Sequence, residues 1–245
     1  YAWMGAVGAA LLGAEASEAA DQATVSVDVG ALPASQFPVS EPLSMSRVRL
    51  LRDIAPQGEV SGDGVLDTYL GIDVGSVSTN LVLIDDECRV LKEIYVKTDA
   101  RPVEVVDKAL HDLQAEFGAS IRLCGVGTTG SGRELVGELT GADIVTDEIT
   151  AHKTGADFIG RMIDRRVDTI FEIGGQDSKF ISLQDGVVVD FAMNEACAAG
   201  TGSFLEEQAE KLGISIIGEF AELALSSQTP VRLGERCTVF MERDV

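Results

Sequence analysis

Gly71-Ile-Asp-Val-Gly75-Ser-Val-Ser-Thr79 is the stretch on which the predicted fold depends. It joins two apolar runs through a tight turn, with Asp73 just before the turn and hydroxyl groups at Ser76 and Ser78 within it. The N–H groups of such a turn can surround a phosphate while the carboxylate holds a hydrated magnesium ion. The same pattern is also typical of a structural hairpin, so this turn alone does not decide between the two.

A second turn of similar composition occurs later in the chain, in Glu172-Ile-Gly174-Gly175-Gln-Asp177-Ser-Lys179. Each turn follows the first of three successive predicted strands. Two such turns in two similar β-meanders indicate a duplicated architecture that clamps one nucleotide between its halves. The combination is more specific than either turn by itself.

From Asp67 onwards, short apolar runs are mixed with longer amphipathic ones, which predicts an α/β fold. Strands are expected at 69–74, 79–84, 89–97, 121–126, 144–145, 169–173, 179–183 and 187–193. Helices are expected to begin at Pro102 and to occupy 131–139, 148–162, 203–212 and 217–226. The Asp185-Gly186 pair favours a hairpin turn. His152 lies near the apolar face of its helix and is interpreted as a packing residue.

A cysteine followed by very small residues stands in Asn194-Glu-Ala-Cys197-Ala-Ala-Gly-Thr-Gly-Ser-Phe204. Small residues let the backbone approach a bulky ligand, and the start of a helix offers unpaired N–H groups to an anionic one. A thiolate-bound cluster and a phosphate both fit this pattern, as does a buried structural cysteine. Ser203 and Glu206 have the spacing of a capping box at the start of the helix.

The 245 residues include 40 acidic and 19 basic ones, which gives a formal net charge of −21 at pH 7. Nucleic acid and anionic membrane surfaces would be repelled by this charge, so neither is expected as a partner. The four cysteines are widely spaced in a chain that is not small. This spacing favours free thiols in a reducing compartment, and we therefore expect a cytoplasmic protein.

The N-terminal part of the chain has a different composition. Residues 1–14 form an apolar run that lacks an initiator methionine and a preceding basic residue, which favours a small-residue helix over a signal peptide. Residues 16–66 show no sustained periodicity, and they are interrupted by Pro33, Pro38, Pro42 and Pro56. This pattern predicts a linker, with a short helix at 44–54.

Taken together, the motifs resemble those of the actin, sugar-kinase and Hsp70-like ATPases, and within them the BadF/BadG/BcrA/BcrD-type activators of 2-hydroxyacyl-CoA dehydratases and benzoyl-CoA reductases. The resemblance covers about 69–245. It is carried by the two turns, by Cys197-Ala-Ala-Gly-Thr-Gly202 and by Cys237-Thr-Val-Phe240. The cysteine motifs are specific to the activators. The expected fold is therefore an actin-like (ribonuclease H-like) α/β ATPase fold of two lobes, with the second lobe truncated.

The resemblance implies an ATPase that holds one 4Fe-4S cluster across a homodimer or a pair of repeats, with Cys197 and Cys237 as the ligands from each member. ATP binding between the lobes would change the angle of the helices beside the cluster. Hydrolysis would then drive a low-potential electron into an acyl-CoA dehydratase or reductase component, with ferredoxin or flavodoxin as the donor. Cys88 and Cys124 lie outside the motifs and are interpreted as packing or surface thiols.

The resemblance also assigns roles to the residues of the two turns. Asp73 would organise magnesium, and Gln176 would orient the attacking water. ATP or ADP would be bound by the remaining turn residues, namely Gly75, Ser76, Ser78, Gly174, Gly175 and Asp177. Glu172 stands where activators usually carry aspartate, and it is expected as a further magnesium ligand.

The expected organisation is a terminal helix of a preceding repeat at 1–15, a linker at 16–66, a first lobe at 67–147, a connecting helix at 148–163, and an incomplete second lobe with the cluster loops at 164–245. Two alternatives remain open. A small-molecule kinase of the same superfamily would leave the cysteine motifs unexplained. A catalytically silent repeat used for dimerisation or docking is compatible with Glu172 and with the preceding repeat.

Overall fold

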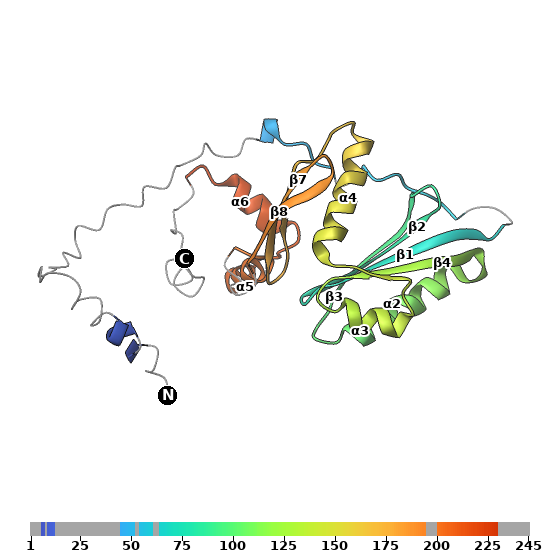
Figure 1. The fold of residues 1–245 in the computed structure, drawn as a ribbon, viewed down its shortest axis with the longest axis horizontal. Coiled ribbons are helices and arrows are strands. Elements are labelled where there is room, and N and C mark those ends of the chain that lie inside the picture. The colour runs from blue at the N-terminus through green and yellow to red at the C-terminus, as the bar shows by residue number, and fades with distance from the viewer. Residues whose placement is uncertain are drawn as a thin grey trace, which may run out of the picture. The chain divides into compact units, whose positions relative to one another are not determined.

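The computed structural model describes residues 6–7, 9–12, 45–51, 54–60, 64–194 and 200–229 (Figure 1). The chain divides into two units, residues 1–50 and 51–245. In the first unit, residues 6–7 and 9–12 are helical, in agreement with the predicted small-residue helix. The helix predicted at 44–54 is wrong over the described residues, because only the 3-10 turn η2, Met45–Arg47, is helical there.

A five-stranded sheet forms the first lobe of the second unit. Its strands are β1 (Leu66–Val74), β2 (Ser78–Asp85), β3 (Val90–Lys97), β4 (Ile121–Thr129) and β5 (Ile144–Val145), in the order β3-β2-β1-β4-β5. The first three strands are antiparallel, as the predicted meander requires, whereas β4 and β5 are parallel to β1 and β4 respectively. The first lobe is therefore a mixed sheet, and the predicted α/β class is confirmed.

Two helices, α2 (Pro102–Phe117) and α3 (Arg133–Thr140), pack against this sheet (Figure 1). Pro102 stands in the first turn of α2, where its missing N–H leaves no helical hydrogen bond unmade. A short 3-10 helix, η3 (Gly118–Ser120), leads from α2 into β4. The core between helices and sheet consists of fully or almost fully buried aliphatic side chains such as Ile72, Leu81, Val106 and Val136.

Residues of the expected linker extend this sheet. Gln57 pairs with Val90 of β3 in a parallel bridge. The Gly58 N–H donates to the Val90 carbonyl at 2.9 Å, and the Val90 N–H donates to the Pro56 carbonyl at 2.7 Å. Residues 56–58 therefore lie along the edge of β3 at Val90.

The connecting helix α4 (Glu148–Met162) begins where it was predicted to begin. Its N-cap, Asp147, accepts a hydrogen bond from the Thr150 N–H at 2.9 Å. This bond satisfies one of the N–H groups that have no partner within the helix.

A second antiparallel sheet follows α4, with strands β6 (Thr169–Ile173), β7 (Ser178–Gln184) and β8 (Val187–Asn194) in that order. Asp185 and Gly186 have positive φ angles of 52° and 77°, as expected for the predicted hairpin turn between β7 and β8. Two helices, α5 (Gly202–Leu212) and α6 (Glu219–Ser226), complete the described part of the second lobe. Among the described residues, no helix has both the length and the apolar character that a membrane crossing requires.

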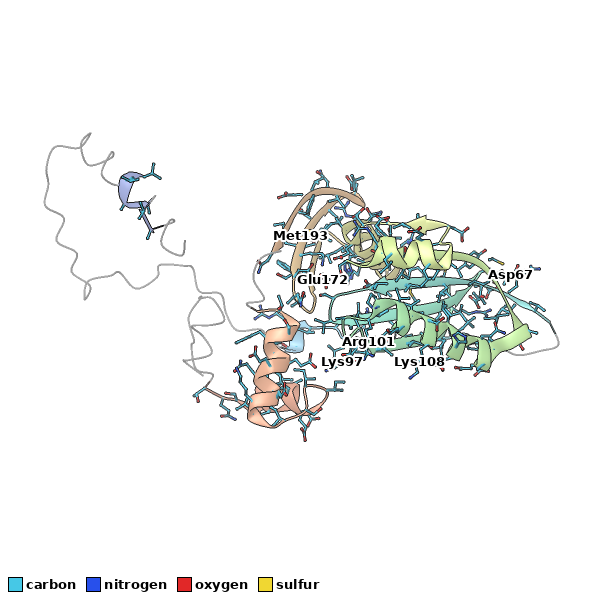
Figure 2. All side chains as sticks on the ribbon, turned by 90° about the horizontal axis from the view of Figure 1, so that it is seen from below. Asp67, Lys97, Arg101, Lys108, Glu172 and Met193 are labelled. Atoms are coloured by element: carbon cyan, nitrogen blue, oxygen red, sulfur yellow. The ribbon has the colours of Figure 1, made fainter. Side chains whose placement is uncertain are left out.

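The capping box predicted for Ser203 and Glu206 is wrong. The N-cap of α5 is Thr201, and Ser203 already lies within the helix. Glu206 does not turn back to the helix start, because its carboxylate forms an ion pair with Lys97 of β3 (Figure 2). A partner distant in sequence therefore displaces the local hydrogen bond that the spacing suggested.

Candidate functional site

The turn between β1 and β2 is closed by a hydrogen bond from the Gly75 N–H to the Ser78 carbonyl at 2.9 Å. A Cβ atom at position 75 would lie 2.7 Å from that carbonyl oxygen, so only glycine fits. Thr98 supports the turn from behind: its Oγ1 donates to the Gly75 carbonyl at 2.8 Å, and its N–H donates to the Val77 carbonyl at 2.9 Å. These bonds hold the turn in one conformation.

The turn between β6 and β7 has the same closure. The Gly174 N–H donates to the Asp177 carbonyl at 3.0 Å, which corresponds to the Gly75–Ser78 bond of the first turn. A Cβ atom at position 174 would lie 2.9 Å from Asp177 Oδ1 and 3.1 Å from Glu172 Oε1. Repetition of the closing hydrogen bond, again from a glycine N–H, supports the predicted duplication.

The two turns meet at a single pocket of 580 Å³. A Cβ atom at Gly175 would lie 2.4 Å from Val77 Cγ2, so the tip of the second turn touches the tip of the first. Every residue assigned to the turns from the sequence lines this pocket: Asp73, Gly75, Ser76, Ser78, Glu172, Gly174, Gly175, Gln176 and Asp177. The structure thus brings both predicted turns together, although about a hundred positions separate them in the sequence.

A third glycine-rich segment, which the sequence analysis did not assign to the site, follows β4. Gly130 has a φ of +89°, and a Cβ atom there would lie 2.6 Å from Asp73 Oδ1. The Gly132 N–H donates to the Val74 carbonyl at 2.9 Å, and Ser131 lines the pocket. The signal that could have found this segment is a glycine-rich loop at the carboxyl end of a strand parallel to β1, where ligands of α/β sheets commonly bind.

Asp73 lies at the end of β1 and is paired in register with Thr129 of β4. No described residue donates a hydrogen bond to its carboxylate. Burial raises the pKa of the Asp73 carboxyl above its ordinary value, and the charges of Glu148 and Glu172 act in the same direction. His152 and Lys179 oppose that shift. Asp73 is therefore a carboxylate whose charged form would gain from a nearby cation.

Lys179 of β7 is the other functional residue that the sequence analysis passed over. Only 3% of its surface is exposed, yet its Nζ lies 2.6 Å from Glu148 Oε2, 2.8 Å from Glu172 Oε2 and 3.2 Å from Asp177 Oδ1. Burial lowers the pKa of Lys179, but its hydrogen bonds with the three carboxylates outweigh burial and raise it. The signal that could have identified Lys179 is its period-two spacing with Ile181 and Leu183, which places it on the buried face of β7.

His152, interpreted from the sequence as a packing residue, has a half-buried side chain on α4. His152 lines the pocket, and its Nε2 lies 4.0 Å from Glu172 Oε2. Helix periodicity placed His152 on the apolar face of α4. It could not reveal which strands pack against that face.

The charges at the pocket decide what ligand it can take. Five acidic residues line the pocket: Asp73, Glu148, Glu172, Asp177 and Glu206. Lys179 neutralises part of this charge, and Lys97 pairs with Glu206. A phosphate ligand would be repelled unless a divalent cation came with it. No group of three or more histidine, cysteine, aspartate or glutamate side chains in the described part of the chain is arranged to hold a metal ion.

Cys197 and Cys237, the predicted cluster ligands, lie outside the described residues. Cys88 and Cys124 are exposed free thiols, which agrees with their interpretation as surface thiols. The helix that follows Cys197 is hydrogen-bonded to the second turn. The Gly202 N–H donates to the Gly174 carbonyl at 2.9 Å, and the Ser203 N–H donates to the Gly175 carbonyl at 2.8 Å.

Comparisons with known proteins extend these observations. The sequence profile of the BadF/BadG/BcrA/BcrD ATPase family matches residues 70–245. The chain is 32% identical, over 182 residues, to the (R)-2-hydroxyglutaryl-CoA dehydratase activating ATPase of Acidaminococcus fermentans, a match that covers 72% of this chain and 65% of that protein. It is 35% identical over 182 residues to the activator of lactoyl-CoA dehydratase of Anaerotignum propionicum, covering 72% and 65% respectively.

Among solved structures, the activator of the 2-hydroxyisocaproyl-CoA dehydratase from Clostridium difficile with bound ADPNP superimposes with a TM-score of 0.62 and 28% identity. The match covers 72% of this chain and 63% of that one. The chain therefore spans just under two thirds of the length of these relatives. The similarity confirms the predicted actin-like ATPase fold.

Proposed function

Because the chain belongs to the BadF/BadG/BcrA/BcrD ATPase family, we propose that its pocket binds ATP or ADP with Mg²⁺ and that the protein couples ATP hydrolysis to electron transfer. The observation that carries this proposal is the meeting of two identically closed turns at one pocket, beside the Asp73 carboxylate. The turn N–H groups, together with the hydroxyl groups of Ser76 and Ser78, bind the phosphates.

Within this site, Asp73 is the principal magnesium ligand, because no described residue hydrogen-bonds its carboxylate and a cation would relieve the cost of its burial. Glu172 is a secondary ligand that can offer only Oε1, since its Oε2 accepts a hydrogen bond from Lys179. Gln176 lines the pocket on the second turn and orients the attacking water. Gly175 and Asp177 bind phosphate through the backbone of the same turn, which the Gly174 N–H closes.

The electron-transfer part of the proposal assigns Cys197 and Cys237 as ligands of a 4Fe-4S cluster, shared across a homodimer or a pair of repeats. Such a cluster supplies a one-electron carrier of low potential. The acceptor is a 2-hydroxyacyl-CoA dehydratase or benzoyl-CoA reductase component, and a cytoplasmic ferredoxin or flavodoxin is the donor. Support comes from the cysteine motifs and from the relatives, which are named as activators of acyl-CoA dehydratases.

A direct structural link supports coupling between the two sites. The first two N–H groups of α5 donate to the carbonyls of Gly174 and Gly175, so any shift of the second turn pulls on the start of this helix. Residues 200–202 connect that start to the segment that contains Cys197. A nucleotide that changes the position of the turn therefore acts on the start of α5, which follows Cys197 in the sequence.

Nucleotide binding is tested by isothermal titration of the chain with Mg·ADP. Asp73→Asn is expected to lower the affinity and to abolish its dependence on magnesium. The matched control is Asp112→Asn, an exposed aspartate of α2, which should bind as the wild type does. Unchanged magnesium-dependent binding in Asp73→Asn would contradict the role given to this carboxylate.

Cluster binding is tested by anaerobic iron–sulfur reconstitution, iron counting and EPR of the reduced protein. Cys197→Ala and Cys237→Ala are each expected to lose the signal. The controls are Cys88→Ala and Cys124→Ala, which remove exposed thiols outside the motifs and should keep it. A full signal in either of the first two variants would refute the ligand assignment.

A further inference from the structure

The ammonium group of Lys179 joins three separate elements of the fold. Its carboxylate partners are Glu148 at the start of α4, Glu172 on β6 and Asp177 in the second turn, at 2.6, 2.8 and 3.2 Å. A lysine ammonium has three N–H donors. Each donor therefore has one carboxylate, and none is left over for a phosphate.

This geometry distinguishes Lys179 from a residue that touches a nucleotide. It lines the pocket but acts through the carboxylates that surround it. Without its charge, three carboxylates with side chains 20%, 20% and 35% exposed would face one another around an almost fully buried position. Removing the cation from such a network is unfavourable, because the remaining like charges stay partly desolvated and unpaired.

Resting on the nucleotide-binding function proposed above, we propose that Lys179 is a positioning residue that takes the place of a metal ion in the pocket. Its ammonium group neutralises the carboxylates of Glu148, Glu172 and Asp177 and holds them close together, as a bound cation would. The pocket can then receive a nucleotide with a single divalent ion, at Asp73. Lys179 also ties the connecting helix to the second turn, so both move as one body.

Lys179→Ala removes the ammonium group. It leaves the three carboxylates, which α4, β6 and the second turn still hold around the vacated position. Ammonium ion has the same charge and hydrogen-bonding character as the lost group, and potassium ion has a similar size, so either one would replace the lost charge among the three carboxylates. The variant should therefore become dependent on a cation that the wild type does not need.

The experiment measures the thermal unfolding midpoint of the full chain, without nucleotide, in ammonium, potassium or tetramethylammonium chloride at equal ionic strength. Tetramethylammonium is too large for the vacated position and has no N–H donors, so it reports screening alone. For Lys179→Ala we expect an unfolding midpoint several degrees higher in ammonium or potassium chloride than in tetramethylammonium chloride. The midpoint should keep rising with the cation concentration, because the cation binds the folded state and not the unfolded one.

Three control proteins separate cation binding at this position from a general salt effect. The wild type should show no selective response, because Lys179 already occupies the position. Lys179→Met fills the same space without charge and should show none either. Lys153→Ala removes a lysine that pairs with a single carboxylate, Asp157 at 2.8 Å, and should respond equally to all three salts.

Binding of Mg·ADP gives a second measurement that a purely structural role would not affect. In tetramethylammonium chloride, Lys179→Ala should bind the nucleotide about 5- to 150-fold more weakly than the wild type, the usual range for coupling between two ligand sites. Ammonium chloride should recover much of that loss. Lys179→Arg keeps the charge and should bind more tightly than Lys179→Ala in every salt.

Two results would overturn the proposal: equal midpoints of Lys179→Ala in all three salts, or a variant that stays unfolded at every ammonium concentration. The function proposed above fails separately, if the wild type does not bind Mg·ADP. Even then, a higher unfolding midpoint of Lys179→Ala in ammonium or potassium than in tetramethylammonium would establish that Lys179 takes the place of a cation.

Discussion

Val77 of the first turn packs directly against Gly175 of the second, so closely that a Cβ atom at position 175 would lie 2.4 Å from Val77 Cγ2 and 2.6 Å from Val77 Cβ. The contact joins two turns that belong to different sheets. The gap between the turns therefore has no room for another methyl group. Their separation, and with it the width of the pocket between them, is set by this pair.

Gly175→Ala is expected to force the turns apart, to lower stability by about 1–3 kcal/mol as overpacking usually does, and to weaken Mg·ADP binding. Chemical denaturation and calorimetric titration measure the two effects. The double variant Val77→Gly/Gly175→Ala removes the opposing side chain and should recover part of the affinity. Gly155→Ala is the control: no atom lies near its Cβ position on α4, so it should raise stability by about 0.5–1 kcal/mol.

Gly130→Ala should disturb both the end of β1 and the Asp73 carboxylate, since the added Cβ would lie 2.5 Å from the Val74 carbonyl oxygen and 2.6 Å from Asp73 Oδ1. Its φ of +89° adds backbone strain of about 1–2 kcal/mol. Gly141→Ala isolates that strain, because Gly141 has a φ of +64° but no atom within reach of a Cβ. Both variants should be destabilised, and only Gly130→Ala should lose magnesium-dependent nucleotide binding. Equal binding in the two would show that Gly130 does not shape the site.

Thr98→Val should loosen the first turn. The substitution removes the hydroxyl that donates to the Gly75 carbonyl at 2.8 Å and that lies 2.9 Å from Thr79 Oγ1. The buried Thr79 hydroxyl and the half-buried Gly75 carbonyl would each lose this partner, at a cost of about 1–3 kcal/mol. Thr140→Val, which removes a hydroxyl bonded within α3, should cost less. If both variants unfold at the same denaturant concentration, the support given to the turn by Thr98 is negligible.

Asp147→Ala removes the N-cap of the connecting helix and should lower stability by about 0.5–2 kcal/mol. The hydrogen bonds from the Thr150 N–H and hydroxyl lower the pKa of Asp147 below its ordinary value of 3.8. Its charged form thus adds stability that is complete above the unfolded-state pKa and is lost as the pH falls through the lower folded-state pKa.

Asp147→Asn keeps a cap that does not titrate. We therefore expect the stability difference between the wild type and Asp147→Asn to shrink as the pH falls below about 4. Denaturation curves at several pH values measure this difference. A difference that stays constant through the acidic range would contradict the assigned cause.

The sequence by itself determined the strands and α-helices from β1 to α6 and the two glycine-containing turns. These predictions depend on local signals, such as the proline in the first turn of α2 and the Asp185-Gly186 pair. The structure agrees with them: alternate residues of β7 are buried, and both hairpin residues have positive φ angles. Such signals act within a few residues, so the chain's own order is enough to reveal them. The cysteine motifs were recognised in the same way.

Only the tertiary structure decided which side chains make up the pocket. Lys179, His152 and Gly130 acquire their roles from Glu148, Glu172 and Asp73, which approach them through sheet pairing and helix packing. The mistaken capping box has the same origin, because the Ser203 N–H and the Glu206 carboxylate find partners in the second turn and on β3. Charges and hydrogen-bonding groups settle on the nearest partner in space, and a one-dimensional pattern does not contain that distance.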